Sequence, residues 1–203
     1  KLLALCLIFA ISITSVFALD SFIGGYVDYA YENGKKTETL LNITSESTAS
    51  GTAIGFGIIG EEYFSPSFGV GYKIGASKTL TATVNKVKED VSSAPLTLNT
   101  AIDFLYKYEF SSMFALEAGA GLSYDLTEDS YSGVKFSIHT FGVDLKVGTL
   151  ITLFDNFAIS AGANFGVPVY TMPIITTDNQ AVTYDVKVLS FQVAPYIAFM
   201  YKF

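Results

Sequence analysis

The sequence predicts an all-β protein: a closed eight-stranded antiparallel transmembrane β-barrel over residues 19–203, preceded by a cleavable signal peptide at residues 1–18. Three observations predict this fold. Eight segments alternate apolar with small or polar residues, and the connectors between them alternate in length. No apolar run after residue 18 approaches the roughly 20 residues that a membrane-spanning helix needs. Because lipid cannot satisfy the open edge of a sheet, such strands have to close on themselves.

The first 18 residues, KLLALCLIFAISITSVFA, have the pattern of a secretory signal peptide. A lysine precedes an apolar core, and Val16 and Ala18 are the small residues expected before a cleavage site. The pattern predicts a mature chain that starts at Leu19. A transmembrane anchor is the alternative, but the apolar run is short and no stop-transfer flank follows Asp20. The single cysteine, Cys6, lies in the apolar core, so the mature chain has no thiol chemistry.

Seven of the eight segments keep one phase of alternation from end to end. In chain order they are Ser21–Glu32, Gly51–Gly60, Phe68–Ser77, Leu96–Phe110, Phe114–Asp125, Phe157–Val169 and Leu189–Phe203. The apolar faces run through Ile23, Val27 and Tyr29 in the first segment; Ile54, Phe56 and Ile58 in the second; Phe68, Val70, Tyr72 and Ile74 in the third; Ile102, Phe104, Tyr106 and Tyr108 in the fourth; Leu116, Ala118 and Leu122 in the fifth; Ile159, Ala161, Ala163 and Phe165 in the seventh; and Phe191, Val193, Ile197 and Phe199 in the eighth. A strand that alternates in this way has one face in an apolar medium and the other in a more polar one.

The sixth segment, Val134–Thr152, changes phase. Its apolar residues are even-numbered up to Ile138 and odd-numbered from Phe141 onward. One extra residue near His139–Thr140 would reset the alternation, so the pattern predicts a β-bulge there. In the last segment, Pro195 is expected to remove one ladder hydrogen bond.

The connectors alternate short and long along the chain. Short ones are Glu61–Ser67, Ser111–Met113 and Leu153–Asn156, and long polar ones are Asn33–Ser50, Thr79–Pro95, Leu126–Gly133 and Tyr170–Thr183. Barrels of outer membranes have tight periplasmic turns and longer extracellular loops. Aromatic residues gather near the short turns, where they predict an interfacial girdle: Phe22, Tyr63, Phe64, Phe68, Phe110, Phe114, Phe154, Phe157, Tyr201 and Phe203. The opposite girdle is expected from Tyr29, Tyr31, Tyr124, Tyr131, Tyr170 and Tyr184.

The chain ends on an alternating strand with Phe199, Tyr201 and the terminal Phe203 on one face. This ending resembles the C-terminal assembly signal of bacterial outer-membrane barrels. The mature chain as a whole resembles the small eight-stranded outer-membrane barrels of the OmpX/Ail type and the membrane domain of OmpA, in strand count, loop asymmetry and aromatic terminus. The resemblance implies the outer membrane of a diderm bacterium, both termini in the periplasm, outer-membrane lipid and the barrel-assembly machinery as partners, and a host or surface ligand at four extracellular loops. It carries over no functional residue.

Charged residues recur on the predicted lumen face. The expected lumen polar network comprises Asp28, Lys73, Asp103, Lys107, Glu109, Glu117, Asp125, Asp144 and Lys146, and Glu32 has the same phase. These side chains have to pair or be hydrated, because burying a lone charge is costly. They fit either a polar channel or a salt-bridged core. The interior of an eight-stranded barrel is just wide enough to be filled by side chains, which favours the core.

Two motifs invite catalytic or cofactor interpretations. Gly55–Gly60 matches G-x-G-x-x-G, but no helix follows it, so alternating glycines inside a barrel explain it better and no cofactor is predicted. The single His139 lies near Ser137 in sequence, with Asp125 or Glu128 expected nearby, a set that resembles lipid A-modifying barrels. An ordinary polar residue at a bulge is the simpler interpretation.

The net charge of −7 and the absence of arginine argue against nucleic acid as a partner. The sequence therefore favours a non-enzymatic surface or structural role, adhesion or envelope integrity, carried out by the four extracellular loops. A narrow channel for small or apolar solutes, as in OmpW-like barrels, is the alternative, and a lipid A-modifying enzyme is a remote third.

Overall fold

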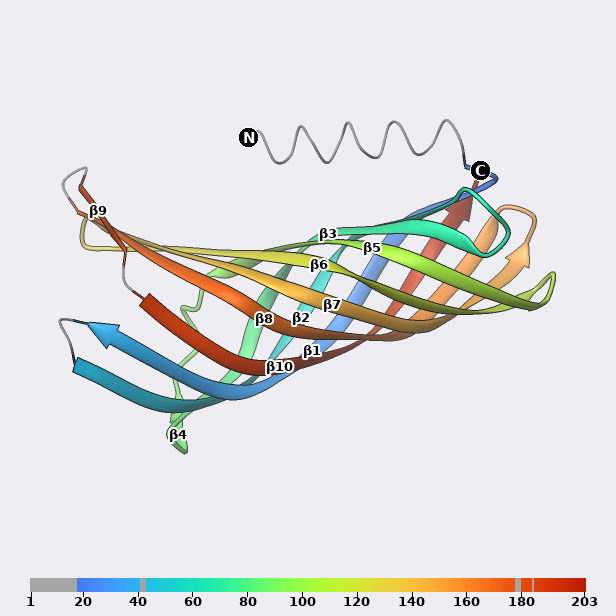
Figure 1. Cartoon of the computed structure of the whole chain (residues 1–203). Coiled ribbons are helices and arrows are strands. Elements are labelled where there is room, and N and C mark those ends of the chain that lie inside the picture. Colours follow the sequence, from blue (N-terminus) through green and yellow to red (C-terminus); the bar gives the residue numbers. More distant parts are fainter. Residues whose placement is uncertain (1–17, 41–42, 178–179, 184) are drawn as a thin grey trace.

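The computed structural model describes residues 18–40, 43–177, 180–183 and 185–203, which fold as a single antiparallel sheet. The strands are β1 (Asp20–Leu40), β2 (Ile43–Tyr63), β3 (Phe68–Val84), β4 (Val87–Glu89), β5 (Leu96–Ser111), β6 (Phe114–Tyr131), β7 (Val134–Phe154), β8 (Phe157–Thr177), β9 (Gln180–Thr183) and β10 (Asp185–Lys202). Eight long strands form a ring that closes where β10 pairs with both β8 and β1 (Figure 1). The short β4 and β9 are return arms that pair with β3 and β8. Among the described residues, no helix is long and apolar enough to cross a membrane.

The alternation in the sequence decides which side chains face the lumen. Odd-numbered residues of β10 such as Ile197 and Phe199 are exposed on the outside, whereas Ala198 and Met200 are buried inside. The same division holds around the ring, with exposed outward residues that include Val27, Phe56, Phe104, Leu122, Leu145 and Phe165. The predicted closed eight-stranded barrel is therefore confirmed.

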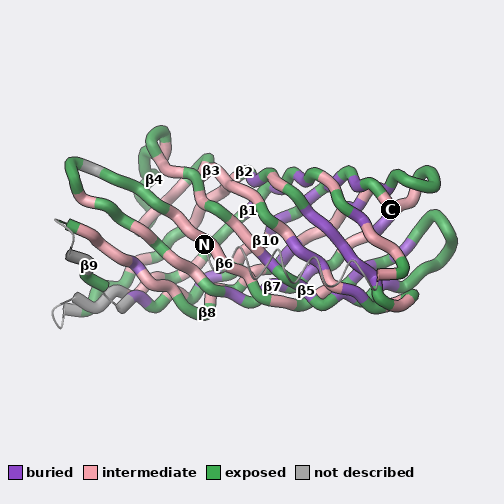
Figure 2. The backbone as a smooth tube through the Cα atoms, turned by 90° about the horizontal axis from the view of Figure 1, so that it is seen from above, coloured by how far each residue is buried: buried purple, intermediate pink, exposed green. Residues whose placement is uncertain are grey.

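The two ends of the barrel differ in length and packing. The connectors at residues 64–67, 112–113 and 155–156 are tight, and β1 begins and β10 ends at this same end (Figure 1). We call it the short-turn end, and the opposite one the hairpin end. Buried residues concentrate in the half of the barrel next to the short-turn end, where the C-terminus lies (Figure 2).

The segments expected to be long loops are largely strand. β1 and β2 stay paired from the membrane region out to Leu40↔Ile43, and β6 and β7 stay paired to Tyr131↔Val134. The β1–β2 extension is rich in threonine, which favours strands, and both extensions lie beyond the membrane, where water reaches both of their faces. These extensions therefore need no apolar–polar alternation. Because the strands were predicted from that alternation, the predicted strands end before the strands of the structure do. Ser132 and Gly133, both with positive φ, close the β6–β7 hairpin.

The prediction of a β-bulge near His139–Thr140 is wrong. β7 runs in unbroken register with β6 through Leu126↔His139 and Asp125↔Thr140. The register shift falls instead between β7 and β8, where Phe141 pairs with Tyr170 but Gly142 pairs with Pro168. The inward-facing positions of β8 therefore change from even-numbered to odd-numbered residues at Val169. In β7 the even-numbered residues stay inward, and Ile138 lines a cavity at the hairpin end.

Eight of the ten aromatics expected at the short-turn girdle are exposed, and two are not. Phe22 is 2% and Tyr63 0% exposed, and their rings meet edge to face inside the barrel. Of the opposite girdle, Tyr29, Tyr31 and Tyr170 are exposed, Tyr184 lies outside the described residues, and the side chain of Tyr131 is likewise not described. Pro195 acts as expected: β1 and β10 pair at Asp28↔Tyr196 and again at Tyr31↔Val193, and the pairs between them are missing.

Candidate functional site

The lumen is closed near the short-turn end by a network of buried charges. Lys146 of β7 forms an ion pair with Glu61 of β2 and lies 3.4 Å from Glu117 Oε2 of β6. The Tyr63 hydroxyl donates to Glu117 Oε1 at 2.6 Å and to Glu61 Oε2 at 3.2 Å. All of these groups are nearly inaccessible to solvent. These contacts therefore tie β2 across the lumen to the neighbouring pair β6 and β7.

Apolar and aromatic side chains pack around this network. Together they make up the plug: Phe22, Glu61, Tyr63, Leu105, Lys107, Glu117, Lys146, Tyr196 and Met200, each less than 7% exposed. Lys107 lies 4.2 Å from the Tyr63 ring centre and pairs with Glu109 at 2.8 Å and Asp20 at 3.4 Å. Glu109 and Asp20 sit at the mouth of the short-turn end and are partly exposed.

A second group of charges lies above the plug, toward the hairpin end. We call it the aspartate cluster: Asp28, Asp103, Asp125 and Asp144, with Lys73 among them. Asp144 interacts electrostatically with each of the other three carboxylates and with Lys73. Lys73 Nζ lies 3.6 Å from Asp28 Oδ2, and Asn99 donates to Asp125 Oδ1 at 2.7 Å.

A series of cavities, the funnel, connects this cluster to the hairpin end. The base cavity, about 40 Å³, is lined by Asp28, Asp125 and Asp144, and the middle cavity, about 210 Å³, shares Asp125 with it. The mouth cavity of about 220 Å³ shares Glu32, Thr140 and Pro168 with the middle one. Small residues line the middle cavity, among them Ser77, Ser123, Gly142 and Gly166, which is why space is left there.

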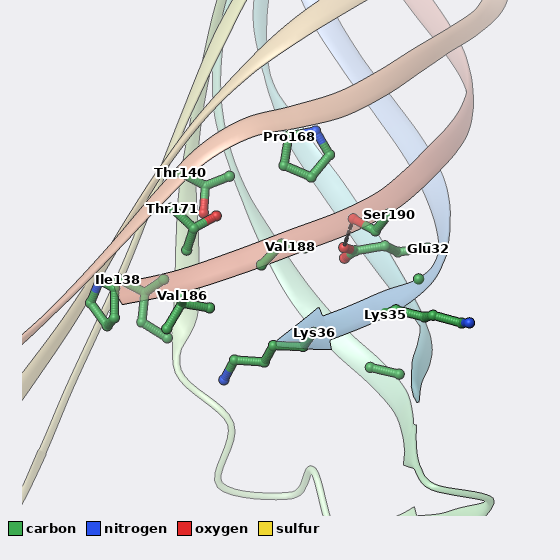
Figure 3. Close-up of a pocket in the computed structure, with 13 residues that line it drawn as sticks. Glu32, Lys35, Lys36, Ile138, Thr140, Pro168, Thr171, Val186, Val188 and Ser190 are labelled. Carbon is green, nitrogen blue, oxygen red and sulfur yellow. Dashed lines mark hydrogen bonds between the residues drawn. The ribbon is translucent and has the colours of Figure 1, made fainter. Parts of the chain in front are cut away.

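Apolar side chains from β7, β8 and β10 line much of the mouth cavity. They are Pro173 and, labelled in Figure 3, Ile138, Pro168, Val186 and Val188. Ser190 closes one side by donating a hydrogen bond to Glu32 at 2.8 Å, drawn as the dashed line in Figure 3. The mouth therefore combines apolar contact area with a few polar groups, among them Lys35 and Lys36, and such a mixture is usual for a small-molecule site.

The barrel wall beside the mouth cavity has a gap in its ladder. β8 and β10 pair at Thr171↔Val186 and again from Gly166↔Gln192 onward. Within the described ranges, residues 187–191 of β10 have no ladder partner on β8, although β1 pairs with them on the other side. Pro168, which has no N–H to donate, faces this stretch. We call this unpaired stretch between residues 187–191 of β10 and the adjacent part of β8 the seam.

The structure distributes the predicted lumen network over these regions. Lys107, Glu117 and Lys146 belong to the plug; Asp28, Lys73, Asp103, Asp125 and Asp144 form the aspartate cluster; and Glu109 lies at the mouth of the short-turn end. Sequence reasoning missed Glu61 because it was placed in a connector. Its odd number matched the inward phase of Gly55, Gly57 and Ile59, and this signal would have identified it.

His139 is not part of the lumen. Its Nδ1 lies 2.8 Å from the Tyr124 hydroxyl, and both side chains belong to outward-facing positions. Ser137 hydrogen-bonds to Glu128 at 3.4 Å rather than to the histidine, and Asp125 faces the opposite side of the sheet. Among the described residues, no three His, Cys, Asp or Glu side chains are placed to hold a metal ion.

An apolar exterior, a charged lumen, tight turns at one end and long hairpins at the other define an outer-membrane β-barrel. The chain belongs to the outer membrane protein beta-barrel domain family, whose model matches residues 3–195. It therefore resides in the outer membrane, in contact with lipid, with the short-turn end in the periplasm and the hairpins outside the cell. No curated protein is detectably similar in sequence.

Solved structures share the fold at low sequence identity. The outer membrane protein OprG from Pseudomonas aeruginosa is 16% identical with a TM-score of 0.62, over 92% of this chain and 96% of that one. AlkL, determined in lipid bilayers, is 14% identical with a TM-score of 0.53, over 91% and 90% of the two chains. Ail of Yersinia pestis is 11% identical with a TM-score of 0.42, over 90% and 99%.

Proposed function

We propose that this protein is a non-enzymatic outer-membrane passage for small solutes with an apolar part, which enter through the funnel and leave sideways through the seam. The observation that supports this most directly is the coincidence of two features. The mouth cavity is lined by Pro168, Thr171, Val186, Val188 and Ser190, and these residues lie within or directly beside the stretch where β8 and β10 lack ladder pairs.

The plug supports a sideways rather than an axial exit. A solute that moved along the barrel axis would have to displace Leu105, Tyr63 and the ion pairs of Lys146, all of which are buried. Opening the seam breaks no ladder pair between β8 and residues 187–191 of β10. The outward residues beside it, Val169, Tyr170, Leu189 and Phe191, are apolar or aromatic, so an apolar solute that leaves there meets lipid.

A reversible cross-link across the seam tests this proposal. Continuing the Gly166↔Gln192 register places Val169 opposite Leu189, and both are strongly exposed on the outside. Oxidised V169C/L189C should lower uptake of labelled naphthalene by expressing cells to the level of cells without the protein, and a reductant should restore it. The matched control is I159C/F199C, a pair on the same two strands within the regular ladder. Wild-type uptake by the oxidised seam variant, or an equal loss in the control, would reject the lateral route.

A surface role through the extracellular hairpins is a second candidate function. The β1–β2 ladder extends without interruption to Leu40↔Ile43 and presents Lys35, Thr48 and other polar residues outside the membrane. A rigid paired hairpin holds a recognition surface in place better than a mobile loop. Replacing residues 35–48 by a two-residue turn should abolish adhesion to host cells or immobilised surfaces without changing naphthalene uptake. Unchanged adhesion would reject this role.

We also propose that the barrel-assembly machinery recognises the last strand, and that residues 1–18 are removed before assembly. The rings of Phe199, Tyr201 and Phe203 face outward at the short-turn end, accessible to a partner. Deleting Phe203 should lower the amount of heat-modifiable barrel in the outer membrane, and a wild-type amount would contradict the proposal. N-terminal sequencing of envelope protein should start at Leu19, and a retained Lys1 would contradict the cleavage. Residues 1–17 lie outside the described residues.

A further inference from the structure

We propose that a niche at the lower end of the seam binds the hydroxyl group of an uncharged solute. We call it the Gly166 niche, and it comprises Asp144 of β7, Asn164 and Gly166 of β8, and Gln192 of β10. The proposal rests on the proposed function, because the solute reaches the niche through the funnel. It names the chemical class that the passage selects, which is a neutral molecule with an apolar body and a hydroxyl group.

The absence of a side chain at residue 166 leaves the space for the niche. Gly166 pairs in the ladder with Asp144 on one side and with Gln192 on the other. A Cβ atom on Gly166 would stand 3.3 Å from Gln192 Oε1 and 3.8 Å from Asp144 Oδ1. Gly166 and Gln192 line both the base cavity and the middle cavity. The space between the two polar side chains is therefore open to the funnel.

Asn164 supplies the second, independent argument. Its side chain is 7% exposed and lines the base cavity. The other asparagine of the base, Asn99, donates to Asp125, whereas the amide of Asn164 has no hydrogen-bond partner within the described part of the chain. A buried polar group without a partner is costly, and a ligand in the base cavity can supply the missing hydrogen bond.

A hydroxyl group matches the hydrogen-bonding groups of the niche. The Asp144 carboxylate only accepts hydrogen bonds, whereas the amides of Asn164 and Gln192 both donate and accept. A hydroxyl group donates one hydrogen bond and accepts others, so it can donate to Asp144 and accept from an amide at the same time. An ammonium group only donates and a carboxylate only accepts. Either ion would therefore leave one part of the niche unsatisfied.

The charges along the funnel favour a neutral solute over an ion of either sign. Lys35 and Lys36 line the mouth cavity together with Glu32, whereas three carboxylates of the aspartate cluster line the base beside Lys73. A cation has to pass the two lysines, and an anion has to approach the three carboxylates. Repulsion between like charges is stronger in a narrow lumen than in bulk water. A neutral solute meets neither barrier.

The niche also places the apolar part of the solute beside the seam. Ladder pairing between β8 and β10 resumes at Gly166↔Gln192, directly below the seam. The middle cavity continues from Gly166 to Pro168, which also lines the mouth cavity. A solute whose hydroxyl group is bound in the niche therefore extends its apolar part toward the mouth, along the route that the proposed function assigns to it.

Titration of the barrel in lipid nanodiscs tests the proposal. The probes are naphthylmethanol, methylnaphthalene, naphthylmethylammonium and naphthoate, substituted at the same ring position. The readout is the shift of backbone amide resonances of residues that line the funnel, and each affinity is expressed relative to the partition of the probe into protein-free nanodiscs. Naphthylmethanol should bind the wild type on the order of tenfold more tightly than methylnaphthalene, the factor expected from one net hydrogen bond. Both ions should bind more weakly than the alcohol.

Two variants assign the preference to the niche. Asn164→Leu removes the amide while keeping a side chain of similar size, and Gly166→Ala fills the space between Asp144 and Gln192. Each should remove most of the preference for the alcohol and retain the binding of methylnaphthalene. The matched control is Asn33→Leu, because Asn33 is exposed and its amide donates to the Tyr31 hydroxyl outside the funnel. This variant should keep the preference of the wild type.

Each outcome separates this inference from the function on which it rests. Equal binding of naphthylmethanol and methylnaphthalene would overturn the hydroxyl site and leave the apolar passage standing. Tighter binding of either ion than of the alcohol would also overturn it, and binding of none of the probes would overturn both the site and the passage. A preference for the alcohol that survives Asn164→Leu or Gly166→Ala in a folded, heat-modifiable barrel would reject the niche. The comparison of the probes on the wild type needs no variant, so a folding defect cannot obscure it.

Discussion

The plug and the funnel occupy two halves of the same lumen and handle charge in different ways. In the plug, Lys146 and Lys107 each pair with two carboxylates, and aromatic rings fill the remaining space. Above the plug, the four aspartates of the aspartate cluster surround Lys73, with Asp103 also close to Lys146, and glycine, serine and threonine leave the cavities of the funnel beside them. Both halves use the same eight strands and, apart from the bulge in β8, the same inward-facing alternation. Alternation therefore decides only which residues face inward, and the size and pairing of those residues decide whether the lumen is closed or hollow.

The largest effect expected from this contrast is that of Lys146→Ala. The substitution leaves Glu61 and Glu117 buried without their cation, and breaking a buried pair in this way costs about 3–5 kcal/mol. Urea unfolding of the refolded barrel in lipid vesicles measures the loss. Lys135→Ala is the matched control, because Lys135 pairs with Glu128 at 2.9 Å on an exposed hairpin, where the cost is about 0–1 kcal/mol. Equal losses in both variants would show that the plug charges are hydrated.

Lys107→Ala should have an intermediate effect. Lys107 is 2% exposed, but its partners Glu109 and Asp20 lie at the opening of the short-turn end, with side chains 51% and 30% exposed. Water can solvate both carboxylates once the lysine is gone, so we expect a loss of about 1–2 kcal/mol, between the surface and buried limits. The same unfolding measurement applies. A loss as large as that of Lys146→Ala would place this pair within the dry part of the plug.

Asp144→Asn should have a small effect of the opposite sign. The substitution removes a carboxyl group that lies close to three others while keeping the shape of the side chain. Relief of repulsion among these groups should raise the free energy of unfolding by up to about 1 kcal/mol. A loss of more than that would mean that Asp144 is already compensated and that the two halves do not differ in charge balance.

The sequence predicts the closed ring and the inward-facing charges because both follow from a period of two. It does not predict which charges meet. Glu61 and Lys146 are 85 residues apart and come together only because β2 and β7 face each other across the closed ring. Barrel closure, which no local pattern encodes, is what creates the plug.

The hairpin end was the part least accessible to sequence reasoning. The extensions of β1, β2, β6 and β8 beyond the membrane lack the alternation that lipid imposes, so they were expected to be loops. The phase change attributed to His139–Thr140 belongs to Val169 on the neighbouring strand, since Phe136 and Ile138 keep the inward phase of β7 above the membrane. The seam lies beside this bulge in β8. The sequence of β7 alone could not show that the bulge belongs to the neighbouring strand.

The smallest effect that we expect is on ion conduction. The plug fills the lumen with side chains that are almost fully buried, so wild-type protein in planar bilayers should show no steady open channel. Lys107→Ala should not open one, because Leu105, Tyr63 and the Lys146 network still block the axis above it. A stable, ion-selective conductance that Lys107→Ala merely shifts would contradict a closed plug and make the axis the solute route. Naphthalene uptake without conductance would instead separate the two halves by function, because an apolar solute can use the seam whereas a hydrated ion that leaves through it would have to enter lipid.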